Sequence, residues 1–269
     1  MNDNQECELV GSSAAMVNLR RDIAVAAGSN TKVLITGESG VGKDITARAI
    51  HQRSTRRSRP FRAINCSSVP DTLLESELFG HLRGSFTGAV RDHQGIFESA
   101  HGGTVVLDEI GDSSARMQGL LLRVLQFGEL QRVGESGPSR LVDLRIVATT
   151  QRNLLEQVSA GEFRLDLYYR LNVIRIHVPP LRDRIEDLPS LVEHFITMLS
   201  DQHQMPCPAL GPDEMAWLAA HPWPGNVREL RNVVERFMIT GELGTMNPSL
   251  DGGMRIRARA PAPAVECRA

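Results

Sequence analysis

The chain has 269 residues, a formal net charge of −2 and 4% aromatic residues. This length suits one large α/β domain with a smaller appendage. The near balance of charge gives no general attraction to nucleic acid or to a membrane surface, and the scarcity of aromatic residues argues against a base-stacking surface. No apolar run approaches the length of a membrane span.

The cysteine and histidine patterns point to neither a disulfide framework nor a metal site. The chain has four scattered cysteines, no C-x-x-C and no secretory leader, which predicts a reduced, cytosolic protein. The eight histidines show no metal-ligand spacing, so each is interpreted as an ordinary surface or core residue.

A glycine-rich loop follows the first predicted strand. Helical spacing over Met16–Ala27 precedes the apolar run Lys32–Thr36, and a helix is predicted over Ile45–His51. The sequence between them is Gly37-Glu38-Ser39-Gly40-Val41-Gly42-Lys43. Strand, glycine loop and helix together predict a phosphate-binding P-loop rather than a mere connecting turn. Asp44 stands where the common motif has a Ser or Thr that binds Mg²⁺.

The next stretch is basic. Residues 51–59 carry four arginines, which we interpret as a solvated loop, with a nucleic-acid patch as the open alternative. A strand over Phe61–Ile64 ends at Asn65, and a helix is predicted over Leu73–Phe79.

Residues 80–95 are rich in glycine and cannot bury a core face. Their centre reads Gly84-Ser85-Phe86-Thr87-Gly88-Ala89, which predicts a mobile loop or a hairpin tip. An exposed Phe on such a segment is unfavourable in water unless it meets a partner, so the loop is a candidate contact site.

Two later strands end in polar residues. The apolar strand Gly103–Glu109 ends in Asp108 and Glu109, at the edge where open α/β sheets bind ligands. We expect Asp108 to hold Mg²⁺ and Glu109 to orient the attacking water. The strand Leu144–Gln151 places Thr150 and Gln151 where they would sense a γ-phosphate.

The remaining elements complete a predicted parallel sheet covered by helices on both faces. A helix over Met117–Phe127 and a hairpin over Leu130–Leu141 lie between the two strands. A helix over Glu162–Arg170 carries Arg164 and Arg170, and a last strand covers Val173–Val178.

From Leu181 onward we expect helices and no strand. Amphipathic spacing predicts helices over Glu186–Gln202, Pro212–Ala220 and Asn226–Ile239, which would form a small lid. The predicted organisation is a disordered stretch 1–8, an α/β nucleotide-binding domain 9–180, a helical lid 181–243 and a disordered Pro- and Arg-rich tail 244–269.

Taken together, residues 9–240 resemble the central AAA+ domain of bacterial sigma-54-dependent transcription activators. The resemblance rests on the glycine loop, on Asp108-Glu109, on Ser76–Gly80, and on the motifs Phe163–Val173 and Pro224–Leu230. The segment 84–89 is the most specific of these motifs, because it differs from the family's G-A-F-T-G-A at one position only.

The resemblance implies roles for individual residues. Asn65 would restrain Glu109, and Arg228 would be the sensor-two arginine. Arg164 and Arg170 would be arginine fingers that reach the ATP of a neighbouring subunit, with an ion pair to Asp166 or Glu162 as the alternative for Arg164. Phe86 and Thr87 would touch the sigma factor. The family works as a ring, usually a hexamer, which opens the closed polymerase–promoter complex.

The sequence departs from the family pattern at three positions, of which Asp44 and Gln151 keep a weakly hydrolysing or non-hydrolysing subunit open, while the change at Ser85 should be tolerated. Asp44 replaces a Glu, Gln151 replaces an Asn, and Ser85 replaces an Ala. The alternatives are a weakly hydrolysing or non-hydrolysing subunit of a mixed ring, and a general AAA+ remodelling ATPase with another client. We expect no receiver domain and no helix-turn-helix in this chain, so DNA binding by the chain alone is expected to be absent or weak.

Overall fold

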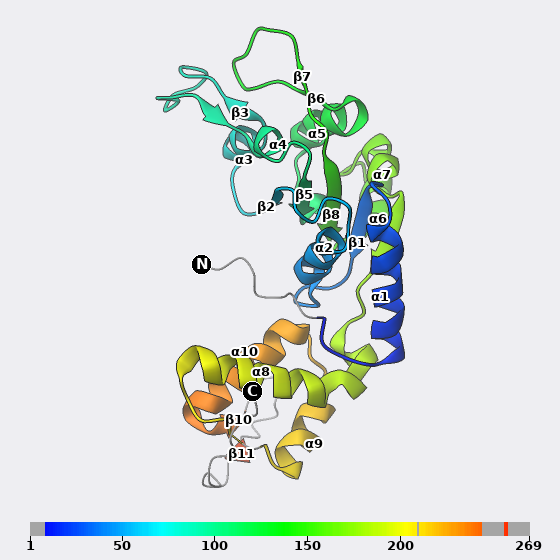
Figure 1. Cartoon of the computed structure of the whole chain (residues 1–269), viewed down its shortest axis with the longest axis vertical. Helices are drawn as coiled ribbons and strands as arrows, with labels where there is room; N and C mark the ends of the chain where they lie inside the picture. The colour runs from blue at the N-terminus through cyan, green and yellow to red at the C-terminus, as the bar shows by residue number, and fades with distance from the viewer. Residues whose placement is uncertain (1–8, 209, 244–255, 258–269) are drawn as a thin grey trace. The chain divides into compact units, whose positions relative to one another are not determined.

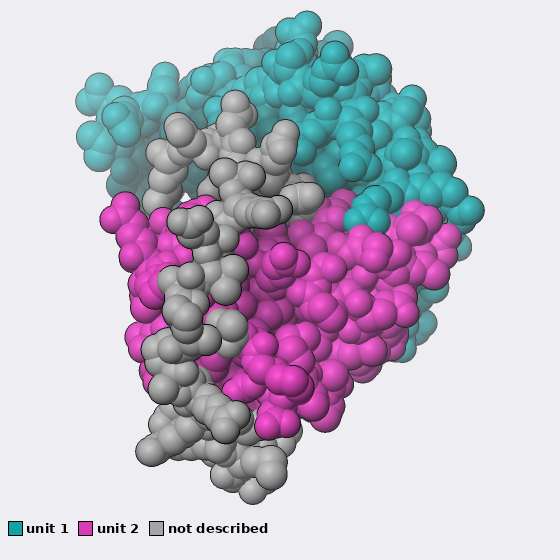
Figure 2. Space-filling model, turned by 60° about the horizontal axis from the view of Figure 1, so that its bottom comes forward, with its two compact units in different colours: residues 1–7, 19–37, 43–178 teal, residues 8–18, 38–42, 179–269 magenta. Residues whose placement is uncertain are grey.

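The computed structural model describes residues 9–208, 210–243 and 256–257, which form two compact units. Residues 19–37 and 43–178 belong to unit 1. Residues 9–18, 38–42 and the chain from Pro179 onward belong to unit 2; the two units are coloured separately in Figure 2. The disorder predicted for 1–8 and for most of the tail falls outside the described residues.

Unit 1 is built on the predicted five-stranded parallel sheet (Figure 1). The strand order is β2-β5-β8-β1-β9, and every neighbouring pair is parallel. Ala148 lies opposite both Leu34 and Leu107, so the three central strands end nearly level. The strands are β1 (Val33–Thr36), β2 (Phe61–Asn65), β5 (Thr104–Asp108), β8 (Arg145–Thr150) and β9 (Ile174–His177).

Both faces of this sheet are buried, which is why its central strands read as continuous apolar runs. Leu34, Leu107 and Ala148 belong to one core cluster with the helices, while the alternating Val106 and Val147 are equally buried on the other face. The helices are α1 (Ala14–Ala27), α2 (Lys43–Gln52), α3 (Asp71–Phe79), α4 (Ile96–Ser99), α5 (Ala115–Phe127), α6 (Leu154–Ser159) and α7 (Leu165–Leu171), with a 3-10 turn η1 (Ile110–Asp112).

Two hairpins project from unit 1, and they are joined to each other. The first is closed by β3 (Gly80–His81) and β4 (His93–Gln94), and the second by β6 (Glu129–Leu130) and β7 (Arg140–Leu141). Val133 joins them, because its N–H donates to the carbonyl of Gly80 at 2.9 Å and its carbonyl accepts from the N–H of Leu82 at 3.1 Å. The predicted second hairpin is confirmed, and the first shows that residues 80–95 include a hairpin tip.

Unit 2 contains the three predicted helices, packed around the fully buried Trp223. They are α8 (Leu188–His203), α9 (Pro212–Ala220) and α10 (Asn226–Thr240), preceded by the 3-10 helix η2 (Leu181–Asp187). The prediction that no strand follows Leu181 is wrong, because β10 (Glu242–Leu243) pairs antiparallel with β11 (Ile256–Arg257). Strands of two residues are too short to show an alternating pattern.

The expectation of reduced cysteines holds for Cys66 and not for Cys207. Cys66 is free, and its burial, with Asp108 nearby, raises the pKa of the thiol to about 12. Cys207 is disulfide-bonded. None of the helices in the described ranges is long and apolar enough to cross a membrane.

A buried carboxylate fixes the start of the described chain within unit 2. Asp187 is 1% exposed and accepts hydrogen bonds from the N–H of Ser12 at 2.6 Å, from the N–H of Ser13 at 2.8 Å and from the Ser13 hydroxyl at 2.6 Å. Hydrogen bonds to a carboxylate are among the stronger ones, and the two donors of Ser13 are buried.

Asp187→Ala should therefore destabilise the protein by about 3 kcal/mol, since it leaves the two buried donors of Ser13 without this acceptor. Chemical unfolding of the full chain measures this change. Asp183→Ala is the matched control, because Asp183 is an exposed carboxylate in the same 3-10 helix, and its loss should cost less than about 0.5 kcal/mol. Equal effects of the two substitutions would contradict this role for Asp187.

Candidate functional site

The glycine loop joins β1 to α2 in a conformation that depends on its glycines. Gly37, Gly40 and Gly42 have φ angles of 156°, 76° and 102°, in the range that residues with a side chain avoid. Gly40 also has no room for a side chain, because an added Cβ would lie 2.3 Å from the carbonyl oxygen of Gly225, within unit 2. This backbone can turn its N–H groups toward an anion, as a P-loop requires.

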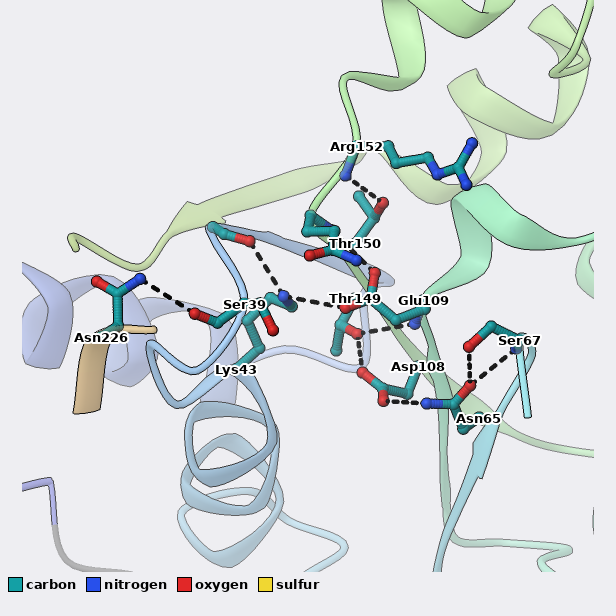
Figure 3. A network of polar contacts seen from close by, with 12 residues as sticks. Ser39, Lys43, Asn65, Ser67, Asp108, Glu109, Thr149, Thr150, Arg152 and Asn226 are labelled. Carbon is teal, nitrogen blue, oxygen red and sulfur yellow. Dashed lines mark hydrogen bonds and ion pairs between the residues drawn. The ribbon is translucent and has the colours of Figure 1, made fainter. Parts of the chain in front are cut away.

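Lys43 is the first residue of α2, and its ammonium is held at the end of the sheet (Figure 3). Its side chain is 7% exposed. The Nζ atom donates to the carbonyl of Gly37 at 3.0 Å and forms an ion pair with Oε1 of Glu109 at 3.1 Å. Burial of an ammonium is tolerated only where such partners exist.

Two carboxylates follow β5, as predicted, and neighbouring strands hold both. Asp108 accepts a hydrogen bond from the amide of Asn65 at 3.0 Å, and a second from the hydroxyl of Thr149. Glu109 has a left-handed backbone with φ 51°, and its Oε2 accepts from the N–H of Gln151 at 3.0 Å. Ends of β2, β5 and β8 thus place amide, carboxylate and hydroxyl groups together (Figure 3).

Asn65 lies beside the carboxylates, with a partner other than the expected one. Its amide nitrogen donates to Asp108, and its Oδ1 accepts from the N–H and the hydroxyl of Ser67 at 2.8 and 2.7 Å. Glu109 is held by Lys43 and by the backbone of Gln151. Restraint of Glu109 by Asn65 therefore stays a prediction.

The other predicted phosphate-side residues differ in exposure. Thr150 is fully buried, and its hydroxyl accepts from the N–H of Arg152 at 3.0 Å. Gln151 is exposed, with its backbone rather than its side chain bonded to Glu109. Asp44 is exposed on the first turn of α2.

Within unit 2, residues of the helical part hold the tip of the glycine loop. Arg182 makes two hydrogen bonds to the carboxylate of Glu38, at 2.8 and 2.5 Å. The fully buried Asn226 donates to the same carboxylate at 3.1 Å and to the carbonyl of Ser39 at 3.0 Å. Arg228 donates to the hydroxyl of Ser39 at 3.1 Å, so this predicted sensor residue does lie at the loop.

Sequence reasoning missed Arg182, Asn226 and the buried Arg184, whose guanidinium donates to the carbonyl of Val41 at 3.1 Å. Burial lowers the pKa of Arg184. Arg182 and Arg184 could have been found from the sequence. They follow Pro179-Pro180 within four residues, in a segment that has no helical periodicity to explain them.

The two predicted arginine fingers stand in different environments. Arg164 caps α7 and makes two hydrogen bonds to Asp166, at 3.0 and 2.7 Å, which is the intrachain pair considered as its alternative. Through that contact Arg164 lowers the pKa of the Asp166 carboxyl. Arg170 is exposed and has no ion-pair partner among the residues that the structure describes.

The loop 84–89 forms the tip of the first hairpin. The N–H of Gly84 donates to the carbonyl of Ala89 at 2.9 Å, and Phe86 is 39% exposed. The ring of Phe86 packs edge-on against His81, with 4.9 Å between ring centroids. Ser85 packs against Gly134 of the second hairpin, and its hydroxyl is buried with no hydrogen-bond partner among the residues that the structure describes. Phe86 is therefore presented at the surface rather than in the core.

Comparison with known families decides what this arrangement is. A family described as "Sigma-54 interaction domain" matches residues 9–177, and one described as "AAA+ ATPase lid domain" matches residues 182–250. The chain belongs to the sigma-54 interaction domain family. The members of this family are AAA+ ATPases, so the predicted fold and the predicted class of enzyme are confirmed.

Individual relatives agree with this assignment. The transcriptional regulatory protein ZraR of Salmonella typhimurium is 49% identical over 236 residues, which cover 87% of this chain and 53% of ZraR. The Nif-specific regulatory protein of Herbaspirillum seropedicae is 49% identical over 239 residues, which cover 88% of this chain and 44% of that protein. The chain thus spans about half the length of these relatives.

Two solved structures superpose well on this chain. NtrX from Brucella abortus in complex with ADP gives a TM-score of 0.81 at 43% identity, over 87% of this chain and 52% of that one. A structure of NtrX in complex with ATP gives a TM-score of 0.80 at 44% identity, over 86% and 52% of the two chains.

Proposed function

We propose that this sigma-54 interaction domain hydrolyses ATP with Mg²⁺ in a ring, and that hydrolysis remodels the closed complex of sigma-54 RNA polymerase to start transcription. The observation that carries this proposal is the buried side chain of Lys43, whose ammonium pairs with Glu109, the residue after Asp108, at the edge of the sheet where β1 and β5 end. The complexes of NtrX with ADP and with ATP support it.

The residues present fit a nucleotide with its metal ion. The glycine loop supplies backbone N–H groups, and Lys43 supplies a positive charge that can move from Glu109 to a phosphate. Asp108 would hold Mg²⁺, which proteins bind through one or two carboxylates together with phosphate oxygens. Glu109 would orient the attacking water. Within unit 1, Thr150, Gln151 and Asp44 would line the phosphate side, and within unit 2 Arg228 would act at the tip of the glycine loop.

A ring would complete the site, because Arg170 has no acidic partner of its own in the described part of the chain. Exposed apolar side chains lie on and next to the same short helix: Leu165, Tyr169 and Val173 are 49%, 67% and 58% exposed. An exposed cation flanked by apolar groups suits contact with a second copy. The ring is proposed as a homo- or hetero-hexamer in the cytoplasm.

The two alternatives from the sequence are less well supported. Asp44 and Gln151, which suggested a weakly hydrolysing subunit, are exposed, and neither substitution removes Lys43, Asp108 or Glu109. The match of residues 9–177 to the sigma-54 interaction domain family argues against a general remodelling ATPase with another client.

Lys43→Ala should abolish nucleotide binding, whereas Glu109→Ala should bind ATP and lose at least about 10²-fold in kcat, the usual contribution of a residue that positions or deprotonates water. A fluorescent ATP analogue measures binding, and phosphate release measures turnover. Arg175→Ala removes an exposed cation on β9 and is the matched control. Normal turnover by Glu109→Ala would refute the assigned role.

If Arg170 acts on the ATP bound by a neighbouring subunit, two inactive variants should restore each other's activity when they are mixed. Arg170→Ala and Glu109→Ala should each be inactive, and a mixture of the two should recover part of the activity, because each subunit supplies what its neighbour lacks. An arginine finger contributes roughly 10³–10⁵-fold, so even partial rescue is measurable. Phosphate release is followed as protein concentration rises. Mixtures as inactive as the separate variants, at concentrations where rings form, would exclude action in trans.

Substitution of Phe86 tests whether its side chain contacts a partner or stabilises the fold. Phe86→Ala should cost about 1 kcal/mol or less, because the side chain is already 39% exposed, and should leave ATP hydrolysis within about a few-fold of wild type. Binding to sigma-54 with ADP and aluminium fluoride should be lost, as should open-complex formation. The same losses of partner binding are expected for Thr87→Ala.

Phe97→Ala is the matched control for stability. Phe97 is 1% exposed and packs edge-on against Phe79, so its removal should cost about 3–5 kcal/mol. If Phe86→Ala lowers the thermal midpoint as much as Phe97→Ala does and also abolishes hydrolysis, Phe86 is a core residue and not a contact.

A further inference from the structure

One surface of unit 1 has a charge quite unlike that of the whole chain. The chain is nearly neutral, yet residues 45–70 contain six arginines and no acidic residue. Four of these arginines are exposed, on the turn after α2 and on β2. We call them the α2–β2 arginine patch: Arg53, Arg57, Arg59 and Arg62.

The backbone that carries the patch is ordered by its own hydrogen bonds. The hydroxyl of Ser54 donates to the carbonyl of His51 at 2.7 Å, and the N–H of Arg59 donates to the carbonyl of Arg56 at 2.8 Å. β2 is an edge strand that pairs only with β5, and Arg62 is exposed on it. The backbone that carries these arginines is therefore held by hydrogen bonds, so binding does not have to order it.

Asp143, which lies beside Arg56, is already engaged in an ion pair. Arg56 binds both carboxylate oxygens of Asp143, at 2.8 and 3.0 Å, so Asp143 has little left to neutralise the patch. A further arginine, Arg145, is fully buried and has no carboxylate partner in the described structure. Its guanidinium donates to the carbonyl of Ala26 at 2.6 Å. Burial, together with the charge of Arg56, lowers the pKa of Arg145.

The patch contains no exposed apolar anchor. None of the large hydrophobic side chains that are exposed in the described structure falls within residues 45–70, and Phe61 is covered by the guanidinium of Arg48, 5.0 Å from the ring centroid. Protein partners are usually held by buried aromatic or aliphatic anchors, whereas phosphate backbones are bound by arginines and small polar groups. Ser58 and Thr55 are exposed among these arginines.

We propose that the α2–β2 arginine patch binds the phosphate backbone of duplex DNA, independently of base sequence. Three of these arginines come just before β2, and Arg62 is its second residue, so the patch lies at the amino ends of the parallel strands. The phosphate-handling residues lie at the carboxyl ends of the strands. DNA and ATP would thus occupy opposite edges of one sheet. The contact would be weak for a single chain and additive in a ring, since each subunit adds its own patch.

The test is fluorescence anisotropy of a labelled 30-base-pair duplex of arbitrary sequence, titrated with the full chain at several salt concentrations. The variant is the triple substitution Arg57→Ala, Arg59→Ala and Arg62→Ala. A control of equal charge removes three exposed arginines on other elements of unit 1: Arg21→Ala, Arg123→Ala and Arg175→Ala. Circular dichroism and binding of the fluorescent ATP analogue verify that both variants are folded.

Wild type should bind at about 50 mM salt, with an affinity that falls steeply as salt rises. The patch variant should lose most of this affinity, and the slope of log K against log salt should become shallower by about 0.9 for each phosphate contact removed. The control should keep the wild-type slope. Retained ATP binding in the patch variant would separate this outcome from any failure of the proposed ATPase function.

Three results would overturn the proposal. The first is a wild-type chain that fails to bind the duplex even at low salt. The second is an equal loss of affinity in the patch variant and in the charge control. The third is binding of a labelled poly-glutamate peptide, titrated in parallel, without binding of the duplex, which would assign the surface to an acidic protein segment.

Discussion

The ion pair between Lys43 and Glu109 is the interaction around which unit 1 is arranged. An ammonium at 7% exposure must be compensated, and its partners come from the ends of β1 and β5. These groups meet because parallel strands end at a common edge. One cation and two carboxylates are held at that edge by the apolar strands, by the helices that cover both faces of the sheet and by the glycine turn.

Much of this could be predicted because the signals are local. β1, β5 and β8 are continuous apolar runs followed by polar residues, and a strand–glycine–helix succession identifies the P-loop from a dozen residues. The lid helices show amphipathic spacing for the same reason, since each buries one stripe against a shared core. The glycine neighbours of Phe86 predict an exposed loop, and the structure presents Phe86 at the surface.

The rest depends on pairs that are distant in sequence, for which composition and periodicity carry no information. Arg182 and Glu38 are 144 positions apart, and Asn226 and Glu38 are 188 apart. The amide of Asn65 was expected near Glu109 and instead bonds to Asp108, a choice between adjacent carboxylates that only geometry can make. Arg164 likewise has an acidic residue two positions away, and nothing in the sequence decides between that neighbour and a second subunit.

Unit 2 is built from three separate stretches of the chain, which limits how this unit can be exchanged between related proteins. The helical part is joined to residues 9–18 through Asp187 and to residues 38–42 through Arg182 and Asn226. A chimera that replaced only the segment after Pro179 would keep residues 9–18 and 38–42 of the recipient. These residues would then pack against helices from another protein. Recombination of this unit is therefore productive only when all three stretches come from one parent or when the pairs across each junction match.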